Sequence, residues 1–288
     1  PDVETVKRGL EPALVGRRIA HVDLRRKDLR IPFPAHFAER LSGKRITGMG
    51  RRAKYLLADL DDGETLIIHL GMSGRLTLSG KKALAPGKNG KGGYYHEIRP
   101  LTQHDHVVFD LDDGERLVFN DPRRFGLMSL APTAELADAP FFQHLGIEPL
   151  GNELSAEHLL DGLKGRKTSL KAALLNQTFV VGIGNIYACE ALHRARLSPK
   201  RLCNTMNRER AARLAEAIKA VLTEAIEAGG SSLKDYVQAD GSLGYFQHRF
   251  AVYDREGQPC PRKTCKGTKI RRIVQSNRST FYCPNCQR

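Results

Sequence analysis

The sequence predicts an α+β fold, with strands in the first half of the chain and helices in much of the second. Three observations indicate this: short apolar segments before about residue 130, a long amphipathic segment at 208–228, and a basic tail with two cysteine pairs. With 288 residues, 41% of them hydrophobic, the chain can bury a sizeable core in one large domain or two smaller ones.

The first element is an expected helix at the start of the chain. Val3, Val6, Leu10 and Leu14 recur at the spacing that places them on one side of a helix. Gly16 is expected to end it, because glycine adopts the backbone conformation that closes a helix.

Five short apolar segments bounded by turn residues are expected to be strands, at 54–60, 65–71, 75–79, 106–111 and 116–120. The unit Asp-Leu-Asp-Asp-Gly-Glu occurs at 59–64 and again at 110–115, each time before an apolar segment. Because Asp-Gly favours a tight hairpin turn, we expect two antiparallel hairpin systems, packed as a sandwich or a flattened barrel.

The segment 80–100 is rich in Gly, Lys and Pro and is expected to be a mobile insertion. Helical spacing follows later, most clearly at 208–228, where Gly229 and Gly230 end the pattern. Residues 181–185, Val-Gly-Ile-Gly-Asn, precede another expected helix. Such a turn can offer backbone N–H groups to a phosphate, but it is also a common way to begin a helix.

The last 32 residues carry the strongest single signal. Cys260 and Cys265 are separated by four residues, and seventeen more precede Cys283 and Cys286. Two close cysteine pairs across a short hairpin can hold one zinc ion, which would be structural because four protein ligands leave no open position. Two reduced cysteine pairs without metal are the alternative.

The formal net charge of +14 results from 46 Lys and Arg against 32 Asp and Glu. This favours a polyanionic partner, nucleic acid or an acidic membrane surface, over a merely basic soluble protein. No apolar run approaches the ~18 residues of a membrane span, and residues 1–10 do not resemble a secretory signal. We expect a cytoplasmic protein in which Cys189 and Cys203 are ordinary buried thiols.

Several side chains in the first half are candidates for chemistry or for binding nucleic acid. Lys54 precedes a strand, where its amine could contact a phosphate or assist proton transfer, although a surface lysine is the simpler interpretation. Glycine-containing turns at 69–74 and 120–126 present three groups that could enter a base stack, Met72, Arg123 and Phe125. As isolated residues, Met72 and Phe125 would more often belong to a core.

Two further clusters have simpler alternatives. His104 and His106 alternate around an aspartate, which places them on one face of a strand and does not require a metal. The tail is basic and could contact phosphates or be a solvated charge cluster, and its candidate residues are Lys263, Lys266, Lys269, Arg271, Arg272 and Arg278.

Taken together, eight segments resemble the formamidopyrimidine-DNA glycosylases, bacterial repair enzymes for oxidised purines. In chain order they are PDVETVKRGLEPALVG, GRRAKYLL, HLGMSG, QHDHVVF, DPRRFG, VVGIGNIYA, QADGSLGYF and RSTFYCPNC. The resemblance covers most of the chain outside the insertion at 80–100. It implies an N-terminal helix and β-sandwich at 1–130, a helix–two-turn–helix domain at 131–250 and a zinc hairpin at 251–288.

The resemblance also implies roles for individual residues in a monomer that binds double-stranded DNA and flips a damaged base out of the duplex. The gap in the duplex would be filled by Met72, Arg123 and Phe125. DNA contacts are implied for His104, Arg123, Arg166 and Asn185. Lys54 resembles the lysine needed for base removal and β-elimination, and Arg278 the arginine of δ-elimination. The lesion-recognition loop would be Gln238–Phe246, and one structural zinc would be held by Cys260, Cys265, Cys283 and Cys286.

Three features depart from the family. Arg166 stands where a lysine is expected, and four residues separate the first cysteine pair where two are common. The family chain begins Pro-Glu-Leu-Pro, with the first proline as nucleophile and the glutamate as acid, and Pro1 here corresponds to the second proline. We expect that three residues precede Pro1 in the enzyme. In the alternative, Pro1 and Asp2 would replace Pro-Glu, although they start ~10 Å of extended chain too late.

The expected function is excision of oxidised purines such as 8-oxoguanine and formamidopyrimidines, followed by β- and δ-elimination through a proline imine. An endonuclease VIII-like enzyme for oxidised pyrimidines is an alternative within the same chemistry. A damaged-DNA-binding protein without catalysis and an RNA-binding zinc protein are alternatives from other classes.

Overall fold

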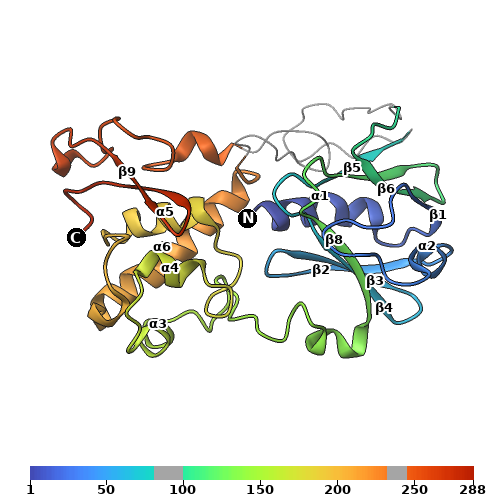
Figure 1. Ribbon diagram of the computed structural model, residues 1–288, viewed down its shortest axis with the longest axis horizontal. Coiled ribbons are helices and arrows are strands. Elements are labelled where there is room, and N and C mark those ends of the chain that lie inside the picture. The colour runs from blue at the N-terminus through green and yellow to red at the C-terminus, as the bar shows by residue number, and fades with distance from the viewer. Residues whose placement is uncertain (81–99, 232–244) are drawn as a thin grey trace. The chain divides into compact units, whose positions relative to one another are not determined.

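The computed structural model (Figure 1) describes residues 1–80, 100–231 and 245–288, and it confirms the α+β fold class. The chain divides into two units, one made of residues 1–143 and 229–245 and the other of 144–228 and 246–288. The expected insertion at 80–100 lies almost entirely outside the described residues, as does the expected lesion-recognition loop except for Tyr245 and Phe246.

The first unit contains two four-stranded antiparallel sheets. One has the order β1-β6-β7-β5 (Ile19–Leu24, Asp105–Leu111, Arg116–Asn120, Arg75–Ser79). The other has the order β2-β3-β4-β8 (Ile46–Arg52, Tyr55–Leu60, Glu64–His69, Leu127–Pro132). Side chains of both sheets share one apolar core, so the expected hairpins form a sandwich and not a barrel.

The repeated turn unit joins β3 to β4 and β6 to β7, as predicted. Gly63 and Gly114 both have φ of +83°, the left-handed conformation for which glycine is favoured at these turns. Strands β1, β2 and β8 were not expected. The sequence of β2, Ile-Thr-Gly-Met-Gly-Arg-Arg, contains two glycines and only one buried residue, so it lacks the apolar alternation that identifies a strand.

The expected N-terminal helix is α1 (Asp2–Leu14). Val6, Leu10 and Leu14 are buried in the sandwich core, which explains the spacing of the apolar residues. Gly16 follows the helix with φ of +87°, and its N–H donates to the Ile46 carbonyl at the start of β2. The described residues of this unit also form two short helices, α2 (Phe37–Leu41) and the 3₁₀ helix η1 (Thr133–Asp138).

The second unit is built on four helices, α3 (Ala156–Leu163), α4 (Leu170–Leu175), α5 (Asn185–Arg194) and α6 (Arg208–Glu227). Side chains of Ser155, Ser169 and Asn207 accept hydrogen bonds from backbone N–H groups in the first turns of α3, α4 and α6. Helices α5 and α6 confirm the two expected helices. Three 3₁₀ turns, η2 (Cys203–Thr205), η3 (Phe246–Arg249) and η4 (Lys263–Cys265), lie between or after them.

The unit ends in a two-stranded antiparallel hairpin, β9 (Arg271–Gln275) and β10 (Arg278–Tyr282). Ser276 and Asn277 form its turn with φ of 50° and 58°. A small separate core of buried residues lies beside the hairpin and includes Cys189 of α5. In the described part of the chain, no helix has both the length and the hydrophobicity that crossing a bilayer requires.

Candidate functional site

Lys54 lies in the two-residue turn between β2 and β3, beside the beginning of α1. Ala53, the other turn residue, has φ of 52°, and its carbonyl accepts a hydrogen bond from Arg51 at 2.8 Å. The same arginine pairs with Glu4 of α1, with 2.8 Å between Nε and Oε2. Burial favours a raised pKa for the Glu4 carboxyl, but hydrogen bonds from Arg51 and Arg8 outweigh it and lower that pKa. The ion pair therefore fixes the lysine turn to the helix.

The charge of Lys54 acts on two neighbouring groups. Desolvation lowers the pKa of the Pro1 amine; Asp2 opposes this shift, while Arg51 and Lys54 add to it. Burial lowers the pKa of His69 to about 4, and the charges of Lys54 and Arg30 contribute. Lys54 thus belongs to a cationic neighbourhood at the start of α1. An amine in this neighbourhood is more often unprotonated, which is the form a nucleophile needs.

Met72 and Phe125 lie on two turns and are not core residues. Their side chains are 67% and 46% exposed, which excludes the alternative that they belong to the apolar interior. The guanidinium carbon of Arg123 lies 4.9 Å from the centre of the Phe125 ring. Two apolar side chains and one cation are therefore presented to solvent on adjacent turns.

A buried carboxylate holds these two turns together. Asp121 is fully buried, and its two oxygens accept from the Ser73 hydroxyl at 2.5 Å and from the Gly126 N–H at 2.8 Å. The Ser73 oxygen in turn accepts from the Arg123 N–H at 3.1 Å. Gly71, with φ of 66°, packs so closely that an added Cβ would lie 2.6 Å from the Phe125 carbonyl carbon. The turns at 69–74 and 120–126 therefore form one rigid structure.

The two histidines do not share a strand face, contrary to the expectation. His106 is buried on β6, where its Nε2 lies 2.8 Å from the Asp121 carbonyl oxygen. His104 lies in the turn before that strand, half-buried, because pairing begins only at Asp105. The His104 carbonyl accepts from the Asp121 N–H at 3.0 Å, so this candidate lies next to the turn that carries Arg123.

In the second unit, the two candidate DNA contacts Arg166 and Asn185 lie near the N-terminal ends of two different helices. Arg166 precedes α4, and its guanidinium carbon lies 5.0 Å from the centre of the Phe179 ring. Asn185 is the first residue of α5, after Gly184, and is half-buried. Its Nδ2 donates to the Ser279 carbonyl at 2.9 Å, so the start of α5 contacts the C-terminal hairpin.

Arg278 begins β10 and is exposed, one residue before the carbonyl that Asn185 contacts. Lys171 of α4 also reaches this place, donating to the Ser279 carbonyl at 3.2 Å and to the Thr280 hydroxyl at 2.5 Å. Burial lowers the pKa of the Lys171 amine; the neighbouring Cys189 opposes the shift and the Arg278 charge adds to it. Lys171 and Asn185 together hold the strand that presents Arg278.

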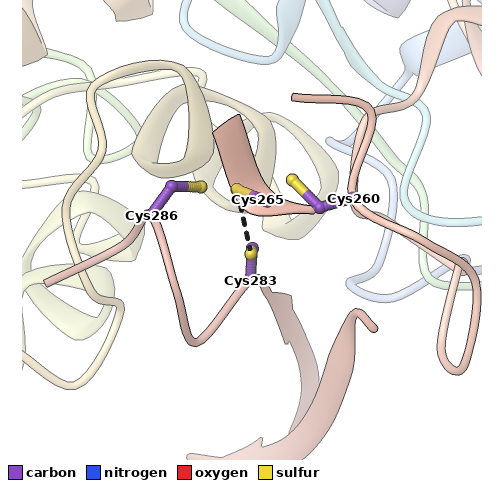
Figure 2. Close-up of side chains that lie close together, drawn as sticks. All are labelled: Cys260, Cys265, Cys283 and Cys286. Atoms are coloured by element: carbon purple, nitrogen blue, oxygen red, sulfur yellow. Dashed lines mark hydrogen bonds between the residues drawn. The ribbon is translucent and has the colours of Figure 1, made fainter. Parts of the chain in front are cut away.

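The four cysteines of the tail converge on one point (Figure 2), and their sulfur atoms all lie within 4.8 Å of one another. Cys283 and Cys265 are 3.8 Å apart, sulfur to sulfur. Tetrahedral zinc with Zn–S bonds of ~2.3 Å requires sulfurs about 3.8 Å apart, so the cluster fits zinc. Burial raises the pKa of the Cys260 thiol to about 11, and a dication among the sulfurs would favour the thiolates. The four cysteines therefore form one structural zinc site.

The basic side chains of the tail face solvent. In the described part of the second unit, ion pairs join Arg194, Arg208 and Arg213 to glutamates on the helices, and none includes a tail cation. The basic tail residues that the sequence singled out are all exposed: Lys263, Lys266, Lys269, Arg271, Arg272 and Arg278. Cys189 and Cys203 are buried thiols, as expected.

Three residues of these networks were missed by sequence reasoning. Ser73 and Asp121 are 48 positions apart, and nothing local to either indicates their contact. The only signal was the repeated placement of polar residues within glycine-containing turns. Lys171 had a clearer sequence signal, because a lysine within Ser-Leu-Lys-Ala-Ala-Leu-Leu stands on a helix whose other residues are largely apolar.

Three family descriptions match the chain. Residues 1–128 match the formamidopyrimidine-DNA glycosylase N-terminal domain, and 145–237 match the H2TH domain of the same glycosylases. Residues 257–288 match the zinc finger found in FPG and IleRS. Together these matches cover most of the chain and follow the order of the two units and the hairpin.

Relatives match over their whole length. The formamidopyrimidine-DNA glycosylase of Beijerinckia indica is 57% identical, covering 100% of this chain and 99% of the relative, and that of Dinoroseobacter shibae is 55% identical with the same coverage. The crystal structure of MutM (Fpg) from Thermus thermophilus has a TM-score of 0.84 at 38% identity, covering 100% of this chain and 97% of that one. Lactococcus lactis Fpg bound to DNA containing an abasic site has a TM-score of 0.85 at 31% identity, with 100% and 98% covered. The chain therefore belongs to the formamidopyrimidine-DNA glycosylase family.

Proposed function

We propose that the protein removes oxidised purines, such as 8-oxoguanine and formamidopyrimidines, from double-stranded DNA and then cleaves the strand at the abasic site. One structural observation carries this proposal: Met72, Arg123 and Phe125 project into solvent from two turns that share a buried hydrogen-bond network. Rigidly held apolar side chains beside a guanidinium have the composition of a wedge that enters a base stack. Such a wedge stabilises a duplex from which the damaged base has been flipped.

The chemistry starts when an amine attacks C1′ of the sugar and the damaged base leaves. The resulting imine makes the neighbouring C–H bonds acidic, so β- and then δ-elimination break the strand on both sides of the sugar. We assign Lys54 to base removal and β-elimination, because its charge lies in the cationic neighbourhood at the start of α1, where an amine nucleophile is less often protonated. Arg278 is assigned to δ-elimination, since it is exposed at the start of β10.

The remaining candidates bind the phosphate backbone. His104 lies against the turn of Arg123, and Arg166 and Asn185 lie at segment starts in the second unit. A guanidinium at position 166 serves a phosphate as well as a lysine would, because it can donate two parallel hydrogen bonds. The exposed tail cations add sequence-independent affinity that falls as the salt concentration rises. The protein would act as a monomer in the bacterial cytoplasm, which contains the chromosome.

Borohydride trapping on an 8-oxoguanine:C duplex tests the proposal, because reduction of the imine leaves a covalent protein–DNA adduct. Two chains are compared, the chain that begins at Pro1 and one extended by Pro-Glu-Leu ahead of it. We expect an adduct on the extended chain at its first proline, located by peptide mass, and none on an undamaged duplex. An adduct at Pro1 would instead make Pro1 the nucleophile. Absence of an adduct on both chains would refute the lyase mechanism.

Three other functions are decided by companion measurements. Lactococcus lactis Fpg has also been solved with DNA containing an oxidised pyrimidine, so a panel of lesion duplexes should include pyrimidine lesions. Faster excision of pyrimidines than of purines would overturn the proposed preference. Tight binding to abasic DNA without cleavage by either chain would favour a non-catalytic damage-binding protein, and stronger binding to RNA would favour an RNA partner.

A further inference from the structure

One face of α5 contacts the zinc hairpin along the whole length of the helix. Asn185, Cys189 and His193 are spaced by four residues and therefore lie on the same side of the helix. Asn185 donates to the Ser279 carbonyl, and Cys189 is buried in the small apolar core that contains Phe281. The third residue, His193, reaches the metal cluster itself.

The imidazole of His193 lies against a zinc ligand. Its Nε2 is 3.4 Å from the Cys260 sulfur, and both residues are buried, at 4% and 6% exposed. His193 is not one of the residues whose ligand atoms converge on the cluster. An N–H group in this place donates to the thiolate sulfur and offsets part of its negative charge, as hydrogen bonds to metal-bound sulfur do elsewhere.

The long spacing of the first cysteine pair supplies a second contact to the same helix. Arg262 lies between Cys260 and Cys265, and its Nη2 donates to the carbonyls of His193 at 3.2 Å and Arg194 at 3.1 Å. These two carbonyls end α5 and carry the negative end of its dipole, and the His193 carbonyl also accepts from the Arg196 N–H at 3.1 Å. The longer loop thus places a cation at the C-terminal end of α5.

We propose that His193 is an outer-sphere hydrogen-bond donor to the zinc thiolate of Cys260, and that His193 and Arg262 couple zinc occupancy to the position of α5. At the opposite end of α5 from His193, the Asn185 side chain contacts the hairpin at the Ser279 carbonyl. Zinc binding would therefore organise both the hairpin and the helix that presents Asn185. The proposal rests on the four-cysteine zinc site and does not depend on catalysis.

The test measures zinc affinity by competition with a chromophoric chelator in four variants of the full chain. His193→Phe removes the donor and retains a ring, and we expect zinc to bind about 10–100-fold more weakly. His193→Gln retains an N–H donor and should recover much of that loss. Arg262→Ala should weaken binding, whereas Lys263→Ala removes an exposed charge from the same loop and should leave zinc affinity unchanged.

Cobalt substitution gives a second, spectroscopic readout. The thiolate-to-cobalt charge-transfer band should shift in His193→Phe and return towards its original position in His193→Gln, while the ligand-field bands stay those of four sulfur ligands. Ligand-field bands that report a lost ligand in His193→Phe would make His193 a direct ligand and overturn the proposal. Unchanged affinity and an unchanged band in His193→Phe would also overturn it. If that variant does not fold, the affinities of His193→Gln and Arg262→Ala relative to Lys263→Ala decide the question.

Amide hydrogen exchange tests the coupling to α5. Removing zinc from the unmodified protein should speed exchange along residues 185–194, and Arg262→Ala should speed it at the C-terminal end of the helix even with zinc bound. Exchange in α5 that does not respond to zinc removal would refute the coupling, whatever the result for affinity.

Discussion

The Ser73 hydroxyl donates to the buried carboxylate of Asp121 at 2.5 Å and accepts from the Arg123 N–H at 3.1 Å. One hydroxyl therefore joins the turn that presents Met72 to the turn that presents Arg123 and Phe125. The Asp121 carboxylate completes the link, because its second oxygen accepts from the Gly126 N–H at 2.8 Å in the same turn as Arg123 and Phe125. It links a buried polar network to the side chains that we expect to enter the duplex.

We expect Ser73→Ala to cost about 1–3 kcal/mol of folding stability, since it leaves an oxygen of Asp121 and the Arg123 N–H without their partners. Base excision from an 8-oxoguanine:C duplex should slow more than cleavage of a preformed abasic site, where no base has to be extruded. Single-turnover rates on the two duplexes measure the ratio. Ser79→Ala is the matched control, because Ser79 ends the strand that follows this turn and its hydroxyl makes only a 3.5 Å contact, to the Arg116 carbonyl. An equal loss on both duplexes would contradict a role in wedge placement.

Local sequence patterns predicted the repeated hairpins, the amphipathic helices and the zinc ligands, because each depends on residues close in the chain. The Asp-Gly turns required only a positive φ, and the cysteine pairs only their spacing. The wedge network could not be predicted, because Ser73 contacts Asp121 through the pairing of β5 with β7. Likewise, Lys171 and Thr280 are 109 positions apart and meet only when the hairpin packs on α4.

Phe125→Ala and Met72→Ala should leave stability nearly unchanged, within about 0.5 kcal/mol, because both side chains lie on the surface outside the apolar core. Affinity for lesion-containing duplex should fall by about 1–3 kcal/mol in Phe125→Ala, the value of one aromatic–base stack, and should also fall in Met72→Ala. Thermal unfolding and DNA titrations measure the two effects. Val15→Ala, at 39% exposed in the same unit, should change neither. A large loss of stability with unchanged affinity would return these residues to an ordinary structural role.

Lys54→Ala should slow base excision about 10²–10⁴-fold, the usual range for losing a group that assists proton transfer. Lys54→Arg retains the positive charge, so its affinity for DNA should fall less than its rate of base excision. Excision rates and borohydride adduct yields on the extended chain measure this. Lys44→Ala, which breaks a surface ion pair with Asp62, is the control. An active Lys54→Ala enzyme would exclude this lysine from the reaction.

Because its imidazole is buried, we expect His69 to make the protein less stable in weak acid. Its pKa is lowered to about 4 by burial, whereas the unfolded value is about 6.5. The unfolded state therefore binds the proton first, so stability is fully present above pH ~6.5 and is lost as the pH falls towards 4. The contribution is at most about 3 kcal/mol. The free energy of unfolding, measured with urea at several pH values, should depend less steeply on pH in His69→Gln than in the unmodified protein. His21→Gln, which changes an exposed histidine, should keep the original dependence on pH. Equal slopes in all three proteins would contradict the assignment.

Zinc removal should weaken DNA binding and also reduce its salt dependence. The hairpin has few buried apolar residues apart from the cysteines, so the metal supplies much of the free energy that folds it. Its six exposed cations are held in fixed positions only while the hairpin is folded, and the slope of log Kd against log salt falls by about one for each phosphate that is no longer bound. Titrations at several salt concentrations, before chelation, after chelation and after zinc is restored, measure this slope. Cys260→Ser should imitate chelation, whereas Cys203→Ala, a buried thiol outside the cluster, should not. A slope that is the same with and without zinc would show that the tail cations do not contact DNA.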